Sequence, residues 1–489
     1  MSPALRVLAA ALAALAVAGC GSEVGQRRSL ALADCRLPGL ATAARCGELE
    51  VPEDRARADG RRIRIFAAVL PANTPTPKDD PLLVLAGGPG QAASFLAPFA
   101  ARLTELRRTR DVVLVDQRGT GRSSPLTCQA FRPRDDDVFV TDPVPRARQC
   151  AQELAAQGVD AAQYTTTAWI ADLEAVRVAL GYPRWNLWGG SYGSRVAQEY
   201  LRRHPDAVRT VTLDGVAPPA MVVPLDIWRT REQALAAVFD ACAASPACRG
   251  AHPDVAGSLA RIERALGPAG RDMDVVDPRT GAVLRHRITP DVVLAALQPL
   301  TYTPETASLL PEMLALAAAG ELAPLFAASP ALSGNMAEQM NAALHFSVTC
   351  AEDVPRIRPG GEQAALAGLA TRRLAEQTLA VCGVWPRGRM PADFALPVQS
   401  DKPVLLLSGG MDPVTPPAYG TVVAQGFPNS RHVIARGYGH IVSPHACAPR
   451  LVGAFVAAGS VAKLPEPCIA RLEKSSRPPL WPDRLGPQP

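Results

Sequence analysis

The residues best suited to chemistry in this sequence begin with a serine between glycines. Ser191 stands at the centre of Gly189-Gly190-Ser191-Tyr192-Gly193, where a strand predicted over 185–188 meets a helix predicted over 191–203. Glycine at both ends of this pattern permits a tight turn that lifts a serine hydroxyl above a sheet. The pattern therefore indicates that Ser191 is a nucleophile, with a structural glycine-rich turn as the alternative.

A serine nucleophile needs a base to take its proton and an acid to orient that base. His440 fits the base because it lies in the loop after the last predicted strand, and His445 is the runner-up. Asp412 fits the acid because it follows a strand predicted over 403–407, and Asp214, which ends an earlier predicted strand, competes with it. The order serine, aspartate, histidine is that of α/β hydrolases.

Backbone donors for a developing oxyanion are available at two places. One is the N–H of Tyr192, next to the nucleophile. The other is predicted in the turn Gly87-Gly88-Pro89-Gly90, which follows a strand predicted over 81–85. Because proline has no N–H, the donor in this turn is Gly88 or Gly90. A plain turn is the alternative.

Short apolar strands alternate with helices along much of the chain, and this rhythm positions the candidate residues. It predicts an α/β fold of the α/β-hydrolase type, with a mostly parallel central sheet flanked by helices. The rhythm stops after 217, where an Ala- and Leu-rich helical pattern without a strand series begins, and it resumes near 398. The predicted segments are a signal peptide (1–20), the first part of the core (21–217), an inserted, mainly helical cap (218–397), the second part of the core (398–470) and a Pro-rich tail (471–489).

Composition and charge exclude several classes of protein. Of 489 residues, 48% are hydrophobic and 20% charged, which is typical of a folded chain and excludes a disordered one. The net charge of +5 is too small to indicate a nucleic-acid partner. The 47 prolines argue against a helical bundle, because proline breaks helix interiors.

The first twenty residues read as an export signal. Arg6 precedes an apolar stretch that ends in Val17-Ala18-Gly19-Cys20, which resembles a bacterial lipobox. We therefore expect cleavage before Cys20 and lipidation of its sulfur, so that the mature protein is attached to the bacterial cell envelope by lipid alone. An ordinary secretory signal is the alternative. Gly21, where an aspartate would indicate inner-membrane retention, favours the outer membrane.

The ten cysteines that remain without Cys20 predict disulfides, because an even number in an exported chain can pair completely. Pairing of neighbours is the simplest expectation. No CxxC or HExxH spacing occurs, so we predict neither a metal site nor a cofactor. The expected pairs are Cys35 with Cys46, Cys128 with Cys150, Cys242 with Cys248, Cys350 with Cys382, and Cys447 with Cys468.

The motifs as a set resemble the α/β-hydrolase peptidases related to proline iminopeptidase, and most closely the tripeptidyl-aminopeptidase branch. The resemblance rests on six segments in the same order along the chain. They are Gly87 to Gly90, Asp116 to Ser123, Gly189 to Ser194, Leu213-Asp214-Gly215-Val216, Asp412-Pro413-Val414-Thr415-Pro416 and Gly439-His440. Ala86 stands where proline iminopeptidases usually have histidine, which argues against specificity for proline.

The resemblance implies an exported enzyme that removes a residue or a short peptide from a free amino terminus. It implies a triad of Ser191, Asp412 and His440, with Gly88 and Tyr192 as oxyanion donors. It also implies that the insertion is a cap that limits access. Cap acids of such enzymes bind the substrate ammonium group. Here Cys350-Ala351-Glu352-Asp353 resembles the branch's Cys-x-x-Asp segment, so Glu352 or Asp353 is the expected anchor, with a solvated turn as the alternative.

Three functional hypotheses follow. The first is a serine aminopeptidase that works through an acyl-enzyme on Ser191. The second is a carboxylesterase or other acyl hydrolase with the same triad, because the fold does not decide between peptide and ester substrates. The third is a non-catalytic, lipid-anchored binding protein on a hydrolase scaffold.

Overall fold

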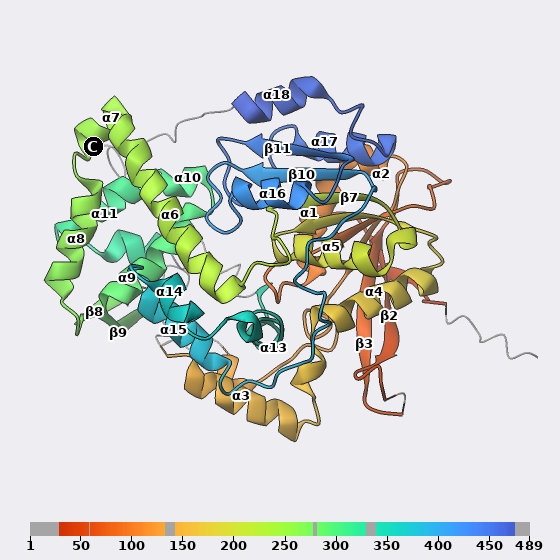
Figure 1. Cartoon of the computed structure of the whole chain (residues 1–489), viewed down its shortest axis with the longest axis horizontal. Coiled ribbons are helices and arrows are strands. Elements are labelled where there is room, and N and C mark those ends of the chain that lie inside the picture. The colour runs from red at the N-terminus through yellow and green to blue at the C-terminus, as the bar shows by residue number, and fades with distance from the viewer. Residues whose placement is uncertain (1–28, 58, 133–141, 277–280, 329–338, 475–489) are drawn as a thin grey trace, which may run out of the picture.

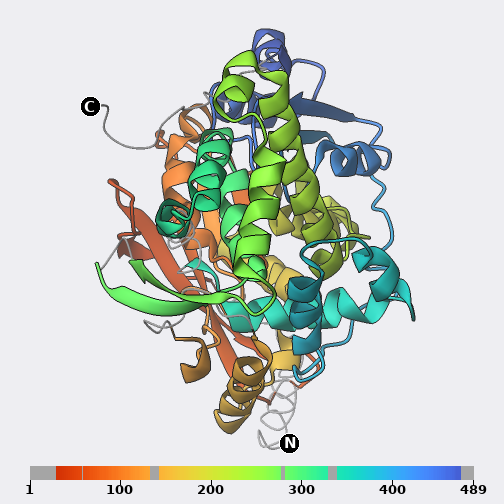
Figure 2. The ribbon, with the colours of Figure 1, turned by 90° about the vertical axis from the view of Figure 1, so that its left-hand side faces the viewer.

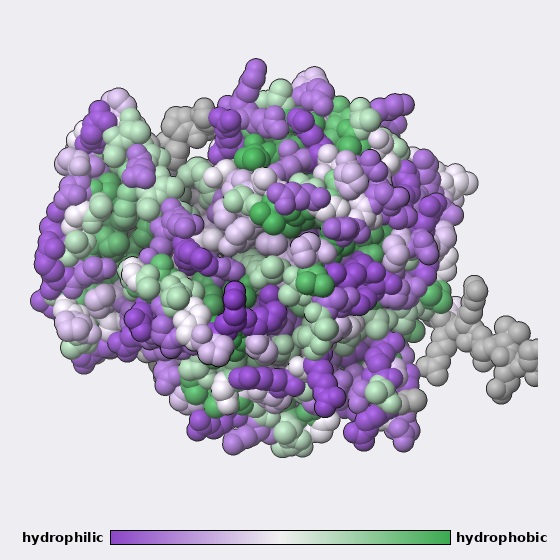
Figure 3. Space-filling view, viewed as in Figure 1, coloured by the Kyte–Doolittle hydropathy of each residue, from purple (hydrophilic) through white to green (hydrophobic). Residues whose placement is uncertain are grey.

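The computed structural model describes residues 29–57, 59–132, 142–276, 281–328 and 339–474. The predicted signal peptide, with the predicted lipidation site Cys20, and residues 475–489 of the predicted tail lie outside these ranges. Within them, no helix is both long and apolar enough to cross a bilayer. On the face shown in Figure 3, hydrophilic side chains are spread over the whole width of the molecule.

A nine-stranded sheet forms the centre of the molecule (Figure 1). Its strand order is β1-β2-β3-β5-β4-β6-β7-β10-β11, and all pairs from β5 to β11 are parallel. The strands are β1 (Ala33–Cys35), β2 (Ala44–Pro52), β3 (Arg62–Leu70), β4 (Leu82–Leu85), β5 (Val112–Val115), β6 (Trp185–Gly190), β7 (Val208–Asp214), β10 (Val404–Gly409) and β11 (Ser430–Ala435). The predicted, mostly parallel sheet is thereby confirmed.

Helices cover both faces of this sheet, which is why its central strands are continuous apolar runs. In β4, Leu83 packs into a core on one face and Val84 into a core on the other, because successive side chains of a strand point to opposite faces. The first face is covered by α3 (Val144–Ala156), α4 (Thr166–Leu180) and α5 (Tyr192–Arg203), and the second by α1 (Ala97–Arg102), α2 (Thr104–Arg107), α17 (Ala448–Ala458) and α18 (Glu466–Lys474). A further helix, α16 (Pro417–Ala424), follows β10.

The chain between β7 and β10 divides into two parts that pack differently. Residues 223–328, here called the outer lobe, enclose a hydrophobic core of their own. Figure 2 shows their helices in front of the sheet. The lobe contains α6 (Val223–Ala244), α7 (Pro246–Ala251), α8 (Val255–Leu266), β8 (Arg271–Val276), β9 (Val283–Ile288), α9 (Pro290–Leu297), α10 (Pro304–Ala307) and α11 (Leu310–Ala318).

The β8–β9 hairpin is a strand pair that the helical pattern of this region did not indicate. Its pairs Asp272↔Arg287 and Asp274↔Arg285 lie opposite each other and form ion pairs. Cross-strand charge pairing of this kind stabilises an exposed hairpin without the apolar run by which a buried strand is recognised.

Residues 339–398, here called the inner segment, pack against the sheet itself. Leu344 and Val348 of α13 (Ala342–Glu352) and Trp385 belong to the same core as the central strands. The segment also contains α14 (Gly361–Leu366) and α15 (Arg372–Val381). The inner segment is therefore continuous with the core of the sheet, although it lies in the insertion.

Five disulfides are present among the described residues, and they are the five predicted pairs: Cys35–Cys46, Cys128–Cys150, Cys242–Cys248, Cys350–Cys382 and Cys447–Cys468. The fourth joins α13 to the end of α15 within the inner segment. The last joins the start of α17 to α18. Disulfides of this number are typical of proteins that fold in an oxidising compartment.

Candidate active site

Ser191 lies at a sharp turn between β6 and α5. Its φ of 57° is in the left-handed region, which non-glycine residues rarely adopt. A Cβ at Gly193 would lie 2.1 Å from the Leu85 carbonyl oxygen, and one at Gly189 would lie 2.2 Å from the Gly193 carbonyl oxygen. The two glycines of the motif are therefore required by close packing, and they permit the turn that places Ser191 at the end of the sheet.

Asp412 and His440 are joined as the sequence predicts. His440 Nδ1 lies 2.8 Å from Asp412 Oδ2 and 3.0 Å from Oδ1. The Asp412 carboxylate also accepts hydrogen bonds of 2.8 Å from the Val414 N–H, the Thr415 N–H and the Thr415 hydroxyl. An Nδ1–H that donates to the carboxylate leaves Nε2 as the acceptor, which is the tautomer that a general base requires.

The end of β7 brings the serine turn and the histidine loop to one place. The Ser191 N–H donates to the Asp214 carbonyl oxygen at 2.8 Å. A Cβ at the next residue, Gly215, would lie 3.0 Å from His440 Cε1. Ser191 and His440 thus lie against two consecutive residues, Asp214 and Gly215, although they come from different segments of the chain.

The two competing candidates have other partners. Both oxygens of the Asp214 carboxylate accept backbone N–H groups, from Val442 at 2.8 Å and Ser443 at 2.7 Å. Asp214 therefore holds the loop that follows His440, and burial raises its pKa. The ring of His445 lies against Tyr438, with 5.6 Å between ring centroids.

The turn predicted to supply an oxyanion donor lies directly against the nucleophile. A Cβ at Gly87 would be 3.1 Å from Ser191 Cβ and 3.6 Å from Ser191 Oγ. The Gly87 N–H donates to Gln91 Oε1, whereas the N–H groups of Gly88, Gly90 and Tyr192 make no hydrogen bond within the described ranges. Gly88 and Tyr192 thus have N–H groups free for a substrate oxygen, and Gly90 remains the alternative to Gly88.

Glu352 and Asp353 lie at the end of α13, and both are buried. The expected alternative, a solvated turn, is therefore wrong. Asp353 forms ion pairs with Arg195 at 3.0 Å and Arg356 at 2.7 Å. Glu352 accepts hydrogen bonds from the backbone N–H of Thr166 at 2.6 Å and from its hydroxyl at 2.8 Å. Their role as anchors for a substrate ammonium group stays a prediction, since both carboxyl groups have partners within the protein.

Burial changes the ionisation of one of these acids strongly. It raises the pKa of Glu352 to about 8, against the opposing effects of the Thr166 hydrogen bonds and the Arg195 charge. Glu352 therefore holds a proton more readily than an exposed glutamate does.

Several residues that shape the site were not identified from the sequence. Thr415 fixes the Asp412 carboxylate and belongs to a motif already noted. Tyr302 comes from the outer lobe; its carbonyl oxygen accepts the His440 N–H at 2.9 Å, and its ring meets the His440 ring edge-on. Thr166 and Gln117 both contact the Tyr192 hydroxyl. Thr166 and Tyr302 carry no local signal, because their partners are distant in the sequence.

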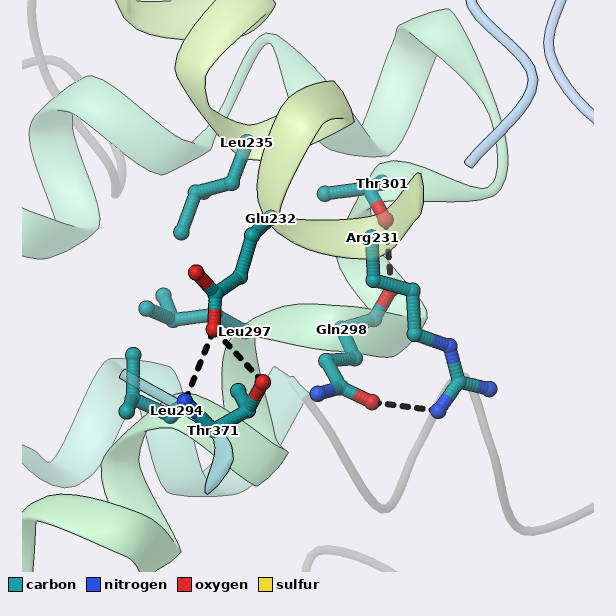
Figure 4. A pocket seen from close by; sticks show the side chains of 8 residues that line it. All are labelled: Arg231, Glu232, Leu235, Leu294, Leu297, Gln298, Thr301 and Thr371. Atoms are coloured by element: carbon teal, nitrogen blue, oxygen red, sulfur yellow. Dashed lines mark hydrogen bonds between the residues drawn. The ribbon is translucent and has the colours of Figure 1, made fainter. Parts of the chain in front are cut away.

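A small cavity lies between α6, α9 and the start of α15, and its lining includes no triad residue (Figure 4). Its volume is about 20 Å³, which is room for a water molecule and not for a peptide. Glu232 borders it and accepts hydrogen bonds from the Thr371 N–H and hydroxyl. Within the described ranges, no group of three or more His, Cys, Asp or Glu residues could hold a metal ion.

Comparison with known proteins places this fold in a family. Residues 80–280 match a family model described as "alpha/beta hydrolase fold", and residues 367–468 match one described as "TAP-like protein". This chain is an α/β hydrolase. The second match begins in the inner segment of the hydrolase and continues through β10 and β11 to α18, so it includes Asp412 and His440.

Curated relatives of this α/β hydrolase include peptidases. It is 38% identical over 141 residues to a "Probable proline iminopeptidase" of Streptomyces coelicolor, covering 29% of this chain and 34% of that protein. It is 31% identical over 207 residues to a "Tripeptidyl aminopeptidase" of Streptomyces lividans, covering 38% and 37%. The chain thus matches about a third of the length of these relatives. A solved proline iminopeptidase of Mycobacterium smegmatis is 18% identical with a TM-score of 0.44, covering 85% of this chain and 99% of that one.

Proposed function

We propose that this hydrolase is a serine aminopeptidase that releases a residue or a short peptide from a free amino terminus. The observation that carries the proposal is the pairing of His440 Nδ1 with the Asp412 carboxylate, beside a serine at a strained turn. The peptidase names of the curated relatives support a peptide substrate over an ester.

In the proposed mechanism, Ser191 Oγ attacks the scissile carbonyl carbon while His440 Nε2 takes its proton. The N–H groups of Gly88 and Tyr192 stabilise the oxyanion that forms. His440 then donates the proton to the leaving amine, and the C–N bond breaks to leave an acyl-enzyme. Water attacks the ester with His440 again as base, which releases the acid product and restores Ser191.

The Asp412 carboxylate holds the imidazole in place during these steps and stabilises its positive charge. Thr415 in turn fixes both oxygens of this carboxylate, since its N–H reaches Oδ1 and its hydroxyl reaches Oδ2. The charge on His440 is thus balanced by an acid that cannot rotate freely.

We also propose that the mature enzyme is exported and attached to the bacterial cell envelope through lipid on Cys20. The five disulfides support export, because they form in oxidising compartments. Fractionation of cells that carry the full chain or its C20S variant tests the anchor. We expect detergent-dependent release of the full chain and a soluble C20S protein; equal solubility of both would contradict lipidation.

A panel of chromogenic tripeptide anilides with free or acetylated amino termini, together with 4-nitrophenyl acetate, tests the activity. We expect turnover of the free peptides, much weaker turnover of the acetylated ones, and loss of all activity in S191A. Turnover of the ester alone would indicate an esterase. Activity that survives in S191A would contradict the assigned nucleophile.

A further inference from the structure

One face of α13 points toward both candidate oxyanion donors. Asn341 caps the helix and contributes its backbone N–H, whereas His345 and Glu352 are seven residues apart, a spacing that places both side chains along one side of a helix. The first two meet the turn that contains Gly88, and the third meets the environment of Tyr192.

At its start, α13 is tied to the glycine turn by two hydrogen bonds. The Asn341 N–H donates to the Gly90 carbonyl oxygen at 2.9 Å, and His345 Nδ1 lies 3.2 Å from the Pro89 carbonyl oxygen. Because a carbonyl oxygen only accepts, Nδ1 carries the proton and donates. Burial lowers the pKa of His345, which favours this neutral tautomer. Pro89 and Gly90, the two residues that follow Gly88, are thus held by hydrogen bonds from α13 and its cap.

At its end, α13 reaches Tyr192 through one intermediate. Glu352 accepts two hydrogen bonds from Thr166, and the Thr166 hydroxyl is hydrogen-bonded to the Tyr192 hydroxyl. Gln117 Nε2 donates to the same tyrosine oxygen at 3.3 Å. The Tyr192 side chain is buried, and its hydroxyl is fixed from two sides.

The attachment of α13 to the protein makes it a firm support for these contacts. A disulfide joins Cys350 to Cys382, and Asp353 pairs with the buried Arg195 of α5, the helix that begins at Tyr192. The ion pair thus holds the end of α13 against α5, and the disulfide holds it against the end of α15.

We propose that α13 holds both oxyanion donors in their catalytic geometry, with Glu352 as the positioning residue for Tyr192 through Thr166. The inference rests on the proposed function. It assigns Glu352 a role in transition-state stabilisation in place of substrate binding, and it makes the inner segment part of the catalytic machinery.

The test uses three single variants of the full chain that each break the link at a different point: E352Q, T166V and Y192F. The matched control is E232Q, because Glu232 accepts the same two kinds of donor from Thr371 at the cavity of Figure 4. The substrate is 4-nitrophenyl acetate, which has no ammonium group. For each variant, kcat, KM and the thermal midpoint are measured at pH 9, above the pKa of about 8 of Glu352, so that E352Q replaces a carboxylate that accepts both hydrogen bonds from Thr166.

We expect kcat to fall about tenfold to a hundredfold in each of the three variants, with KM changed little. Removal of an oxyanion donor lowers kcat by about 10²–10³, and a donor that is only displaced should lower kcat by less. The double variant E352Q/Y192F should be no worse than the more damaged single variant, because both act on one link. E232Q should keep its kcat even where its thermal midpoint falls as far as that of E352Q.

Three results would overturn the proposal. One is a kcat of E352Q equal to that of E232Q, and another is full additivity in E352Q/Y192F. The third is a rise in KM for free tripeptides without a fall in ester kcat in E352Q, which would indicate an ammonium anchor. If S191A is inactive on both the ester and the peptides, each of these results rejects the role of α13 but leaves the proposed function intact. Failure of this inference is thus distinguishable from failure of the proposed function.

Discussion

The two parts of the insertion between β7 and β10 meet the active site in different ways. The outer lobe has its own core and reaches the triad through Tyr302, which contacts His440. The inner segment shares its core with the sheet and is joined to α5 by the buried pair Arg195–Asp353. The insertion is therefore not one structural unit. One part contacts the histidine of the site through Tyr302, whereas the other packs against the sheet that carries the site.

Loss of the buried ion pair Arg195–Asp353 should produce the largest difference in stability between a variant of the inner segment and a variant of the outer lobe. In D353A, Arg195 remains buried without its partner, and the free energy of unfolding should fall by about 3–5 kcal/mol. The control is D272A in the outer lobe, whose pair with Arg287 is solvent-exposed and should matter little. Urea unfolding of both variants measures the difference. Equal shifts in the two variants would remove the distinction between the regions.

The pH dependence of stability tests the burial of Glu352 in the inner segment. Its pKa is about 8 in the folded protein and 4.5 when exposed, so the folded state binds the proton more tightly. This contribution to stability is complete below about pH 4.5 and is lost as the pH rises toward 8.

Wild type should therefore lose stability relative to E352Q by on the order of 3 kcal/mol between pH 5 and pH 8, since one pKa unit corresponds to about 1.4 kcal/mol. Urea unfolding of both proteins at intervals of one pH unit gives this difference. A difference that does not change with pH, or that grows in favour of the wild type as pH rises, would contradict the raised pKa.

Substitution of Tyr302 measures how much the contact of the outer lobe with His440 contributes to catalysis. Y302A removes the ring that meets His440 edge-on but keeps the carbonyl oxygen that accepts the His440 N–H. We expect kcat to fall severalfold, because an edge-on aromatic contact contributes only about 1 kcal/mol. Y302F, which keeps the ring and loses the hydroxyl contact with Arg231, is the control and should be near wild type. A loss in Y302A as large as that in E352Q would make the outer lobe an equal support.

The sequence predicts the parts of this molecule that depend on local patterns. The continuous apolar runs of β4, β5 and β10 identify buried parallel strands. The glycine motifs around Ser191 and Gly88 identify backbone that must turn sharply or approach closely.

Contacts between distant segments could not be predicted in the same way. Glu352 lies 186 residues from Thr166, and nothing near either residue indicates the pairing. In β2, Ala44–Pro52, buried and exposed residues alternate, and the mixture of small and charged residues hides the strand. The division of the insertion into two parts depends on which apolar faces meet in space, which one sequence does not give.

In the proposed mechanism, His440 is held by Asp412 and activates Ser191. Labelling with a fluorophosphonate, followed by peptide mapping, tests it most directly because the probe reacts with an activated serine. We expect the adduct on Ser191 in the wild-type protein, and a labelling rate at least about a hundredfold lower in a folded H440A variant. An adduct on another residue, or labelling of H440A at the wild-type rate, would contradict the account.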